Sequence, residues 1–298
     1  MTATPPLHII SRGVCEFRNK TRGADLVHAV VLIKQVPDTT EVRIDPKTNT
    51  MIRAGVPSIL NPYDANAVEE AVRWRERLGG KVTVITMGPP QAKEALRKCL
   101  SFGADRAILL TDRAFAGADT LATSYALATT IQKIMETEPV DLVFCGRQAI
   151  DGDTGQVGPG VARRLGFEQL TYVIKVDEID PDKGEIQVRR VVEDGIEVVR
   201  TKLPALLTVE KEINEVRYAT MPDLLRAARQ EIEVWTKDTI GADPNQCGLK
   251  GSPTVVSKSF VPSPPDRHLQ LFEGDVAAQA AALAEKLSHL DVFAGRLG

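Results

Sequence analysis

The chain has 298 residues, enough for one large domain or two small ones with a substantial core. Apolar residues make up 43% and charged residues 26%, the balance of a water-soluble globular protein. A net charge of −3 and an aromatic content of 5% argue against a nucleic-acid partner, which needs a basic surface or stacking platforms. No apolar run approaches the ~20 residues needed to cross a bilayer, so we expect no direct membrane insertion.

The spacing of the cysteines argues against a metal site, and the first residues argue against a secretory signal. Cys15, Cys99, Cys145 and Cys247 are far apart and form no C-x-x-C pair, so no metal site is predicted. The first 27 residues are basic, but their apolar stretches are too short for a secretory signal. We therefore expect residues 1–27 to be a disordered N-terminal extension and the protein to be cytoplasmic.

From residue 28 onward, apolar β-branched runs alternate with segments of helical periodicity. The predicted strands are 28–36, 81–87, 106–110 and 140–145. The predicted helices are 62–78, 91–102, 120–135 and 158–165, and a hairpin is predicted at 42–53. Alternation with short links predicts an α/β fold, a parallel sheet with helices on both faces.

After residue 168 the pattern changes to short β-rich segments separated by turn sequences, which predicts a small antiparallel addition. The strands predicted there are 171–176, 185–192, 196–201 and 205–209. From about residue 237 the chain is rich in Gly, Pro and Ser and lacks the periodicity of an independent core. We expect a nucleotide-binding domain at 28–240 and an extended C-terminal arm at 241–298, ending in a helix at 276–290 and packing on another subunit.

Several common catalytic and binding motifs are absent. The sequence has no G-x-G-x-x-G after its opening strand, no P-loop, no G-x-S-x-G elbow and no H-E-x-x-H. No histidine lies in the central sheet region to act as a general base. These absences favour binding over self-contained covalent catalysis, and no catalytic residue is predicted.

The strongest positive feature is the glycine-rich loop 146–159, which follows an apolar strand and enters a helix. In open α/β sheets, ligands bind at the carboxyl ends of the strands, and the free N–H groups of a helix start favour phosphate. Gly146, Gly152 and Gly155 allow close backbone approach or a positive φ. The pattern favours nucleotide binding over its alternative, a glycine-rich connection with a polar cap.

The polar side chains of this loop divide by charge. Thr154 and Gln156 offer hydrogen-bond donors to a phosphate. Asp151 and Asp153 would repel a phosphate at close range, so we expect them to brace the loop or to accept from ribose hydroxyls.

Five stretches of the chain together resemble the electron transfer flavoprotein beta family. They are 31–38, 61–64, 146–157, 188–208 and 214–222, and the resemblance covers about residues 28–240. It implies a fold related to adenine-nucleotide hydrolases, with an adenine nucleotide held by four segments. The cofactor-binding residues that it implies are Leu32, Asn61, Pro62, Tyr63, Asp64, Met87, Gly146, Arg147, Gln148, Ala149, Ile150, Asp151, Gly152, Asp153, Thr154, Gly155, Gln156 and Val157.

Three of these residues also fit a simpler interpretation. Leu32 and Met87 would be core residues in any such sheet, and Asn61 would be a helix cap. The segment 214–222 resembles the family's mobile loop, which docks partner dehydrogenases, with Met221 at an exposed apolar anchor position. Val216 replaces the proline usual there, and a plain connecting loop is the alternative.

The family has two branches that differ in the nucleotide of the beta subunit. One branch holds a structural AMP and is a simple electron carrier that accepts electrons from acyl-CoA dehydrogenases. The electron-bifurcating branch holds a second FAD, which takes a hydride from NADH. The segments 117–123, 151–159 and 248–254 resemble this second branch and its nitrogen-fixation-associated members. The resemblance therefore implies FAD, with AMP as the alternative.

The same resemblance implies a heterodimer with an alpha subunit that carries its own FAD. NADH would be oxidised only within the complex, and the acceptor would be a quinone oxidoreductase or an acyl-CoA dehydrogenase. Gly152, Gly155 and the segment 251–253 are candidates to line the path of a flavin ring. Two other classes of protein share the α/β fold. An ATP pyrophosphatase would need a Ser-Gly-Gly-x-Asp-Ser loop, which is absent after the first strand. A universal-stress-type ATP-binding regulator would lack the antiparallel insert that is predicted here.

Overall fold

The computed structural model describes residues 27–38, 57–257 and 269–290. The predicted extension before residue 27 and the predicted hairpin at 42–53 lie outside these ranges. Contacts divide the chain between residues 259 and 260 into a main unit and a smaller C-terminal unit, which are described separately.

In the main unit, the described residues form a nine-stranded sheet with the order β11-β5-β4-β1-β6-β10-β7-β8-β9. The strands are β1 (Val27–Leu32), β4 (Gly80–Met87), β5 (Arg106–Leu110), β6 (Leu142–Gly146), β7 (Glu168–Asp180), β8 (Glu185–Val192), β9 (Gly195–Lys202), β10 (Ala205–Val209) and β11 (Glu233–Trp235). The pairs from β11 through β7 are parallel, and β8 and β9 are antiparallel additions at one end. The predicted parallel sheet with a small antiparallel addition is confirmed.

The prediction that residues 205–209 belong to the antiparallel addition is wrong. This segment is β10, which lies between β6 and β7 and pairs in parallel with both. All five of its residues are buried. An apolar run without alternation is typical of a parallel strand covered on both faces. Residues 205–209 therefore join the parallel part of the sheet, although they directly follow the hairpin of β8 and β9 in sequence.

The strand predicted at 28–36 is shorter than expected. β1 ends at Leu32, and the residues Gln35–Pro37 form β2, which pairs antiparallel with β3 (Ser58–Leu60) in a separate sheet. The chain leaves the main sheet because the N–H of Lys34 donates to the Asp64 carboxylate and its carbonyl accepts from the N–H of Asn61.

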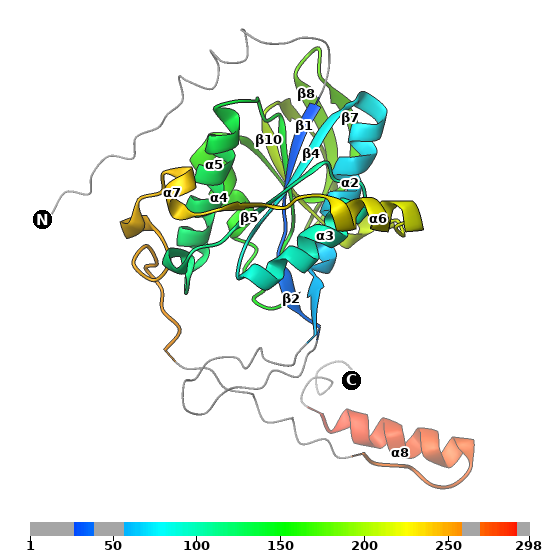
Figure 1. Cartoon of the computed structure of the whole chain (residues 1–298). Helices are drawn as coiled ribbons and strands as arrows, with labels where there is room; N and C mark the ends of the chain where they lie inside the picture. Colours follow the sequence, from blue (N-terminus) through cyan, green and yellow to red (C-terminus); the bar gives the residue numbers. More distant parts are fainter. Residues whose placement is uncertain (1–26, 39–56, 258–268, 291–298) are drawn as a thin grey trace, which may run out of the picture. The chain divides into compact units, whose positions relative to one another are not determined.

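Helices cover both faces of the main sheet (Figure 1). The helices are α2 (Pro62–Leu78), α3 (Lys93–Ser101), α4 (Thr120–Met135), α5 (Val157–Leu165), α6 (Met221–Arg229) and α7 (Lys237–Ile240). Alternate strand residues point to opposite faces: Val31 and Phe144 join the apolar cluster of α2 and α3, and Val30 and Val143 join that of α4 and α5.

The order of the strands creates a topological switch point at β1. From β1 the chain builds outward through β4 and β5, and then returns to β6 on the other side of β1. In open α/β sheets, the loops on the two sides of such a point diverge and form the crevice in which ligands usually bind, so the carboxyl ends of these strands are the candidate crevice.

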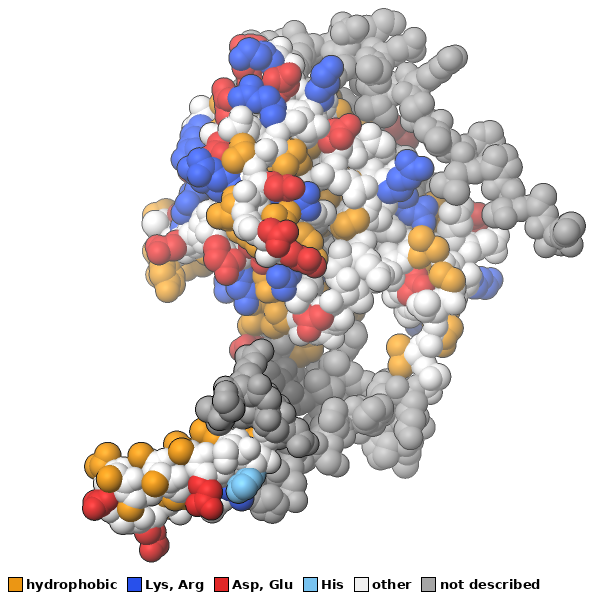
Figure 2. Space-filling model, turned by 180° about the vertical axis from the view of Figure 1, so that it is seen from behind, with side chains coloured by type: hydrophobic (Ala, Val, Ile, Leu, Met, Phe, Trp, Pro, Cys, Tyr) orange, Lys and Arg blue, Asp and Glu red, His pale blue; other side chains and the backbone are white. Residues whose placement is uncertain are grey.

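The smaller unit contains α8 (Val276–Ser288), which confirms the predicted terminal helix. Asp275 begins it by accepting from the N–H of Ala278. Within the part of the chain that the structure describes, none of its residues is buried, and Val276 and Leu283 are among its exposed apolar side chains (Figure 2). The described helices include none that is both long and apolar enough to span a membrane.

Candidate functional site

The structure brings the four predicted segments together at the carboxyl ends of neighbouring strands. Leu32, Met87 and Gly146 are the last residues of β1, β4 and β6, and Pro62 is the first residue of α2. Leu32 is buried in the apolar cluster of α4 and α5, and Met87 packs against the same cluster. These two side chains therefore form the apolar floor of the crevice.

Asp64 joins the ends of two strands. One oxygen of its buried carboxylate accepts from the N–H of Lys34 at 2.8 Å, and the other from the N–H of Gly146 at 2.9 Å. Burial raises the pKa of Asp64 to about 7, against the opposing effect of these hydrogen bonds. Both oxygens bind backbone, so Asp64 positions the loops around the crevice.

Asn61 shapes the beginning of the loop after β6. Its side chain is fully buried; Nδ2 donates to the carbonyl of Gln148 at 2.9 Å, and Oδ1 accepts from the N–H of Ile150 at 3.3 Å. Among the described residues its side chain makes no capping hydrogen bond to α2. Asn61 does stand at the N-cap position of α2, where its backbone carbonyl accepts from the N–H groups of Asp64 and Ala65, but both polar groups of its side-chain amide are engaged by the loop.

The two carboxylates of the loop brace it, as their charge predicts. Asp151 accepts from Nζ of Lys34 at 2.7 Å, and Asp153 accepts from Nε2 of Gln148 at 2.7 Å. The backbone of Asp153 has a φ of 50°, and its N–H donates to the carbonyl of Ala149 at 2.9 Å. The tip of the loop is thus folded on itself and tied to the residues after β1.

The three glycines of the loop have different structural reasons. A Cβ at Gly146 would collide with the Tyr63 side chain and the Asp64 carboxylate, so glycine allows α2 to pack against the end of β6. Gly155 has a φ of 63°, a left-handed conformation that favours glycine. A Cβ at Gly152 would meet no described atom within 4 Å.

The end of the loop meets α4 and α5. Oε1 of Gln156 accepts from Oγ1 of Thr120, the first residue of α4, at 2.8 Å. Val157 begins α5 and packs against the cluster that α4 and α5 share. Thr154 is exposed on the open side of the loop. The start of α5 offers the N–H groups that the sequence assigns to a phosphate.

Arg147 and Tyr63 engage a neighbouring cluster. Nη1 of Arg147 donates to Glu210, after β10, at 3.0 Å, and Nη2 donates to the hydroxyl of Tyr63 at 3.4 Å. The guanidinium also lies over the ring of Tyr172, with 5.8 Å from its carbon to the ring centre. These two predicted residues thus contact β7 and β10 as well as the loop.

A pocket of about 380 Å³ lies beside the crevice, between the start of α4, α5 and the segment 245–253. Its lining residues are Leu121, Arg164, Asn245, Gln246, Lys250, Gly251, Ser252 and Pro253. Of these residues, the sequence predicts a lining role for the segment 251–253 but not for Arg164 or Lys250. Nothing in the sequence marks Arg164 or Lys250 as a site residue, because only the fold brings the arm to α5.

Asp119 holds this part of the arm in place. Its N–H donates to Oγ of Ser252 at 2.8 Å, and its carboxylate accepts from the N–H and the hydroxyl of Thr254 at 3.2 and 2.9 Å. The same carboxylate caps α4 through the N–H groups of Leu121 and Ala122. The segments 117–123 and 248–254, far apart in sequence, therefore lie side by side.

Together, the mostly parallel sheet and the braced loop at its switch point define an open-sheet α/β protein, with a candidate ligand site after β1, β4 and β6. A family model described as the electron transfer flavoprotein domain matches residues 48–240. The chain belongs to the electron transfer flavoprotein family, which confirms the resemblance drawn from its motifs.

Named relatives agree with this assignment. The chain is 56% identical over 248 residues to Protein FixA of Azotobacter vinelandii, covering 83% of this chain and 88% of the relative. It is 53% identical over 268 residues to the electron transfer flavoprotein subunit beta of Thermoanaerobacterium thermosaccharolyticum, covering 90% of this chain and 100% of the relative. The beta subunit of Clostridium acetobutylicum is 55% identical over 233 residues, which cover 78% of this chain and 87% of the relative.

Proposed function

We propose that this chain is the beta subunit of a heterodimeric electron transfer flavoprotein and binds FAD at the loop 146–157. Electrons from NADH would pass through the FAD of an alpha subunit to a quinone oxidoreductase or an acyl-CoA dehydrogenase. One observation carries the choice of FAD: the segments 117–123 and 248–254, which resemble the bifurcating branch, meet around a pocket beside the loop.

The residues around the crevice fit a ligand longer than AMP. AMP needs an adenine slot and a phosphate site, which the floor of the crevice and the start of α5 provide. FAD also needs space beyond its diphosphate, and the pocket lined by Leu121, which follows the Thr120 that binds Gln156, supports this choice. Arg164 and Lys250 bring positive charge to that pocket, which favours an anionic ligand.

The protein would supply position and electrostatics, and the flavin would supply hydride acceptance from NADH and single-electron transfer. Asn61 and Asp64 would hold the loop in its binding conformation. Lys34, about half exposed and paired with Asp151, would stand at the rim of the crevice, where its charge attracts a diphosphate. This assignment needs no side chain of the chain to act as an acid or a base.

The nucleotide content of the purified heterodimer tests the proposal. After denaturing release, we expect two FAD and no AMP per heterodimer, and we expect NADH to bleach the flavin absorbance under anaerobic conditions. One FAD and one AMP, with no reduction by NADH, would instead assign the chain to the simple carrier branch.

We also propose that the partner oxidoreductase docks on the surface of α6. Tyr218 is 97% exposed, and Met221, Leu224 and Leu225 are exposed beside it. Clusters of exposed apolar side chains on a soluble protein are typical of protein contact sites. The segment 214–222 also resembles the docking loop of the family.

A further inference from the structure

Helix α2 carries a row of polar side chains outside the candidate site. Asn66, Glu69 and Glu70 are buried, and Arg73 and Glu76 continue the row at helical spacing. A buried carboxylate is costly unless it is paired and hydrogen-bonded. The partners of this row come from a segment far along the chain, the one that precedes α6.

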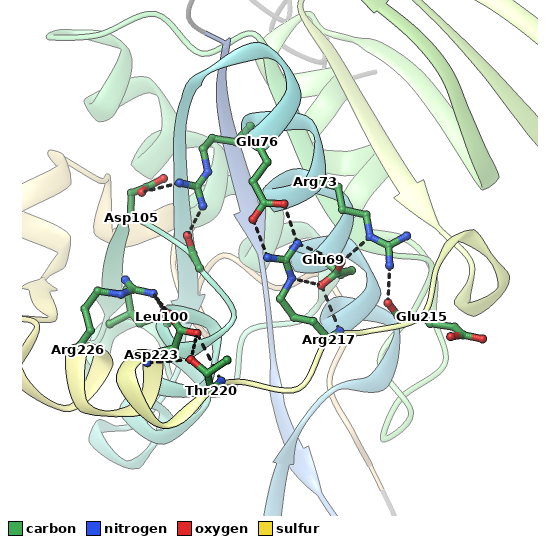
Figure 3. Close-up of polar contacts among 12 residues, drawn as sticks. Glu69, Arg73, Glu76, Leu100, Asp105, Glu215, Arg217, Thr220, Asp223 and Arg226 are labelled. Atoms are coloured by element: carbon green, nitrogen blue, oxygen red, sulfur yellow. Dashed lines mark hydrogen bonds and ion pairs between the residues drawn. The ribbon is translucent and has the colours of Figure 1, made fainter.

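Residues 214–217 lie along this row. Nδ2 of Asn66 donates to the carbonyl of Asn214 at 2.8 Å, and Nδ2 of Asn214 donates back to the carbonyl of Asn66 at 3.1 Å. One step further, Nη2 of Arg73 donates to the carbonyl of Glu215 at 2.7 Å (Figure 3). The backbone of the segment is therefore bound to α2 at successive positions.

Arg217 makes the central contact between the segment and the helix (Figure 3). Its Nε donates to Glu69 at 2.8 Å, and its Nη1 and Nη2 donate to Glu76 at 2.6 and 3.0 Å. Burial alone would raise the pKa of Glu69, but hydrogen bonds from Arg217 and Arg73 hold that pKa below its ordinary value. The guanidinium thus bridges one buried and one exposed carboxylate that lie about two turns apart on α2.

The residues around Arg217 face opposite ways. Val216 and Ala219 are partly buried and pack against the apolar cluster of α2 and α3, whereas Tyr218 between them is almost fully exposed. Thr220 then begins α6 with a capping box, which places Met221 at the first helical position, also exposed. The orientation of Tyr218 and Met221 is set by the contacts that precede them.

The far end of α6 is bound in the same way. Nη1 of Arg97 donates to the carbonyls of Ala227 and Ala228 at 2.6 and 2.9 Å, and Nη2 of Arg226 donates to the carbonyl of Leu100 at 3.1 Å. Arginine contacts therefore hold both ends of α6, and its apolar side chains Leu224 and Leu225 stay exposed.

We propose that Arg217 is a positioning residue: its ion pairs with Glu69 and Glu76 fix residues 214–220 on α2 and present Tyr218 and Met221 in one orientation before any partner arrives. A preorganised surface loses less conformational entropy on binding. The role of this surface in docking rests on the proposed function, but the fixing of the segment is tested without a partner.

The test is the mobility of a nitroxide label at position 218, measured by electron paramagnetic resonance on the heterodimer. The label is attached to Tyr218→Cys in a Cys15→Ser background; the cysteines among the described residues are buried. With Arg217 present we expect a slow component in the spectrum, and with Arg217→Ala we expect its loss. Arg217→Lys should retain part of it, because a single ammonium cannot bridge both carboxylates as the guanidinium does.

Two further variants control the result. Arg200→Ala removes an exposed arginine of β9 that pairs with Glu178 and Glu185, and it should leave the label slow. If Arg217→Ala does not fold, Glu76→Gln removes only the exposed half of the bridge and should lose part of the slow component. An unchanged spectrum in Arg217→Ala, or in Glu76→Gln where that variant replaces it, would overturn the proposal.

FAD content and NADH bleaching separate this inference from the proposed function. Arg217 lies outside the crevice, so both properties should be unchanged in Arg217→Ala while the label becomes mobile. If every variant, including the parent, lacks a second FAD, the proposed function fails, whereas the label spectra still decide whether Arg217 fixes the segment.

Discussion

At the scale of single residues, the side chains around the crevice mostly bind the protein itself. Asn61 and Asp64 use both of their polar groups on backbone atoms of the loops, and Asp151 and Asp153 pair with Lys34 and Gln148. A ligand in this crevice would meet mainly backbone N–H groups and apolar side chains. The shape of the loop, and hence the residues that hold it, should therefore govern nucleotide binding.

The role of Asn61 can be tested by removing its amide. Asn61→Ala loses two hydrogen bonds of about 1 kcal/mol each and leaves the carbonyl of Gln148 and the N–H of Ile150 without this partner. We expect the nucleotide content to fall while the circular dichroism of the sheet is retained. Asn61→Asp keeps the acceptor and loses the donor, so its nucleotide content should lie between those of the wild type and Asn61→Ala. Full nucleotide content in Asn61→Ala would contradict this role.

The glycines of the loop form a graded series. Gly155→Val places a branched side chain at a φ of 63°, which costs on the order of 1 kcal/mol or more, and should release the nucleotide without unfolding the protein. Gly166→Val is the matched control, because Gly166, at the far end of α5, has a φ of 70° and its Cβ would meet no described atom within 4 Å. Gly146→Ala should lower the melting temperature through its collision with Tyr63. Retention of the nucleotide in Gly155→Val, measured after denaturing release, would show that the site lies elsewhere.

At the scale of elements, periodicity predicted the helices of the main unit well where one face is apolar. The helix predicted at 120–135 coincides with α4, because its apolar positions repeat along one face. By contrast, β11 and α6 went unpredicted. β11 has three residues and exists because it pairs with β5, and α6 buries only Ala227 and depends on polar contacts with α2 and α3. The contacts of β11 leave no local pattern in the sequence, whereas the start of α6 does leave one: Thr220 and Asp223 form a capping box, and Pro222 lies in the first turn.

At this scale, the attachment of the arm to α4 through Asp119 can be tested. Asp119→Ala removes the cap of α4, at a cost of about 1 kcal/mol, and also the hydrogen bonds to Thr254. We expect faster proteolysis within residues 241–257 and a lower FAD content. Asp275→Ala removes the comparable cap of α8 and should change neither property. Equal cleavage rates in wild type and Asp119→Ala would contradict this attachment.

At the scale of the whole molecule, the α/β class and the location of the crevice followed from the sequence, and the arrangement around it did not. The place of the loop 146–157 at the end of a strand could be predicted because an apolar run precedes it, but the strand order and the switch point at β1 could not. The pocket could not be predicted either, since it depends on the arm folding back to Arg164 and to Asp119, which lies 133 residues before its partner Ser252. The orientation of Arg147 towards Glu210 depends likewise on the unpredicted place of β10.

The amino ends of the strands make the stability of the protein depend on pH. Nε2 of His28 lies 2.9 Å from the hydroxyl of Thr83, and burial lowers the pKa of His28 despite the opposing charge of Glu138. The other charged groups that face it are those of Lys81 and Asp141. Because the unfolded chain binds the His28 proton more readily, the contribution of His28 to stability should be retained above its ordinary pKa of 6.5 and lost as pH falls below it. Asp64, whose pKa is raised to about 7, contributes the opposite slope, so the effect of His28 is measured as the difference between wild type and variant. His28→Gln should flatten this dependence in thermal melts between pH 5 and 8, and an unchanged slope would contradict it.

The exposed apolar surface of the chain indicates that it needs a second subunit. Ile196 and Val198 are 62% and 60% exposed on β9, the edge strand of the sheet. The 13 residues of α8 include none that is buried in the described part of the chain, and an isolated helix of that length is marginal in water. We therefore expect the chain expressed alone to aggregate or to sediment as a mixture of species. Co-expression with the alpha subunit should give one species of equal stoichiometry carrying nucleotide. A stable, nucleotide-loaded monomer in sedimentation velocity would show that the exposed surface needs no cover and would contradict obligate pairing.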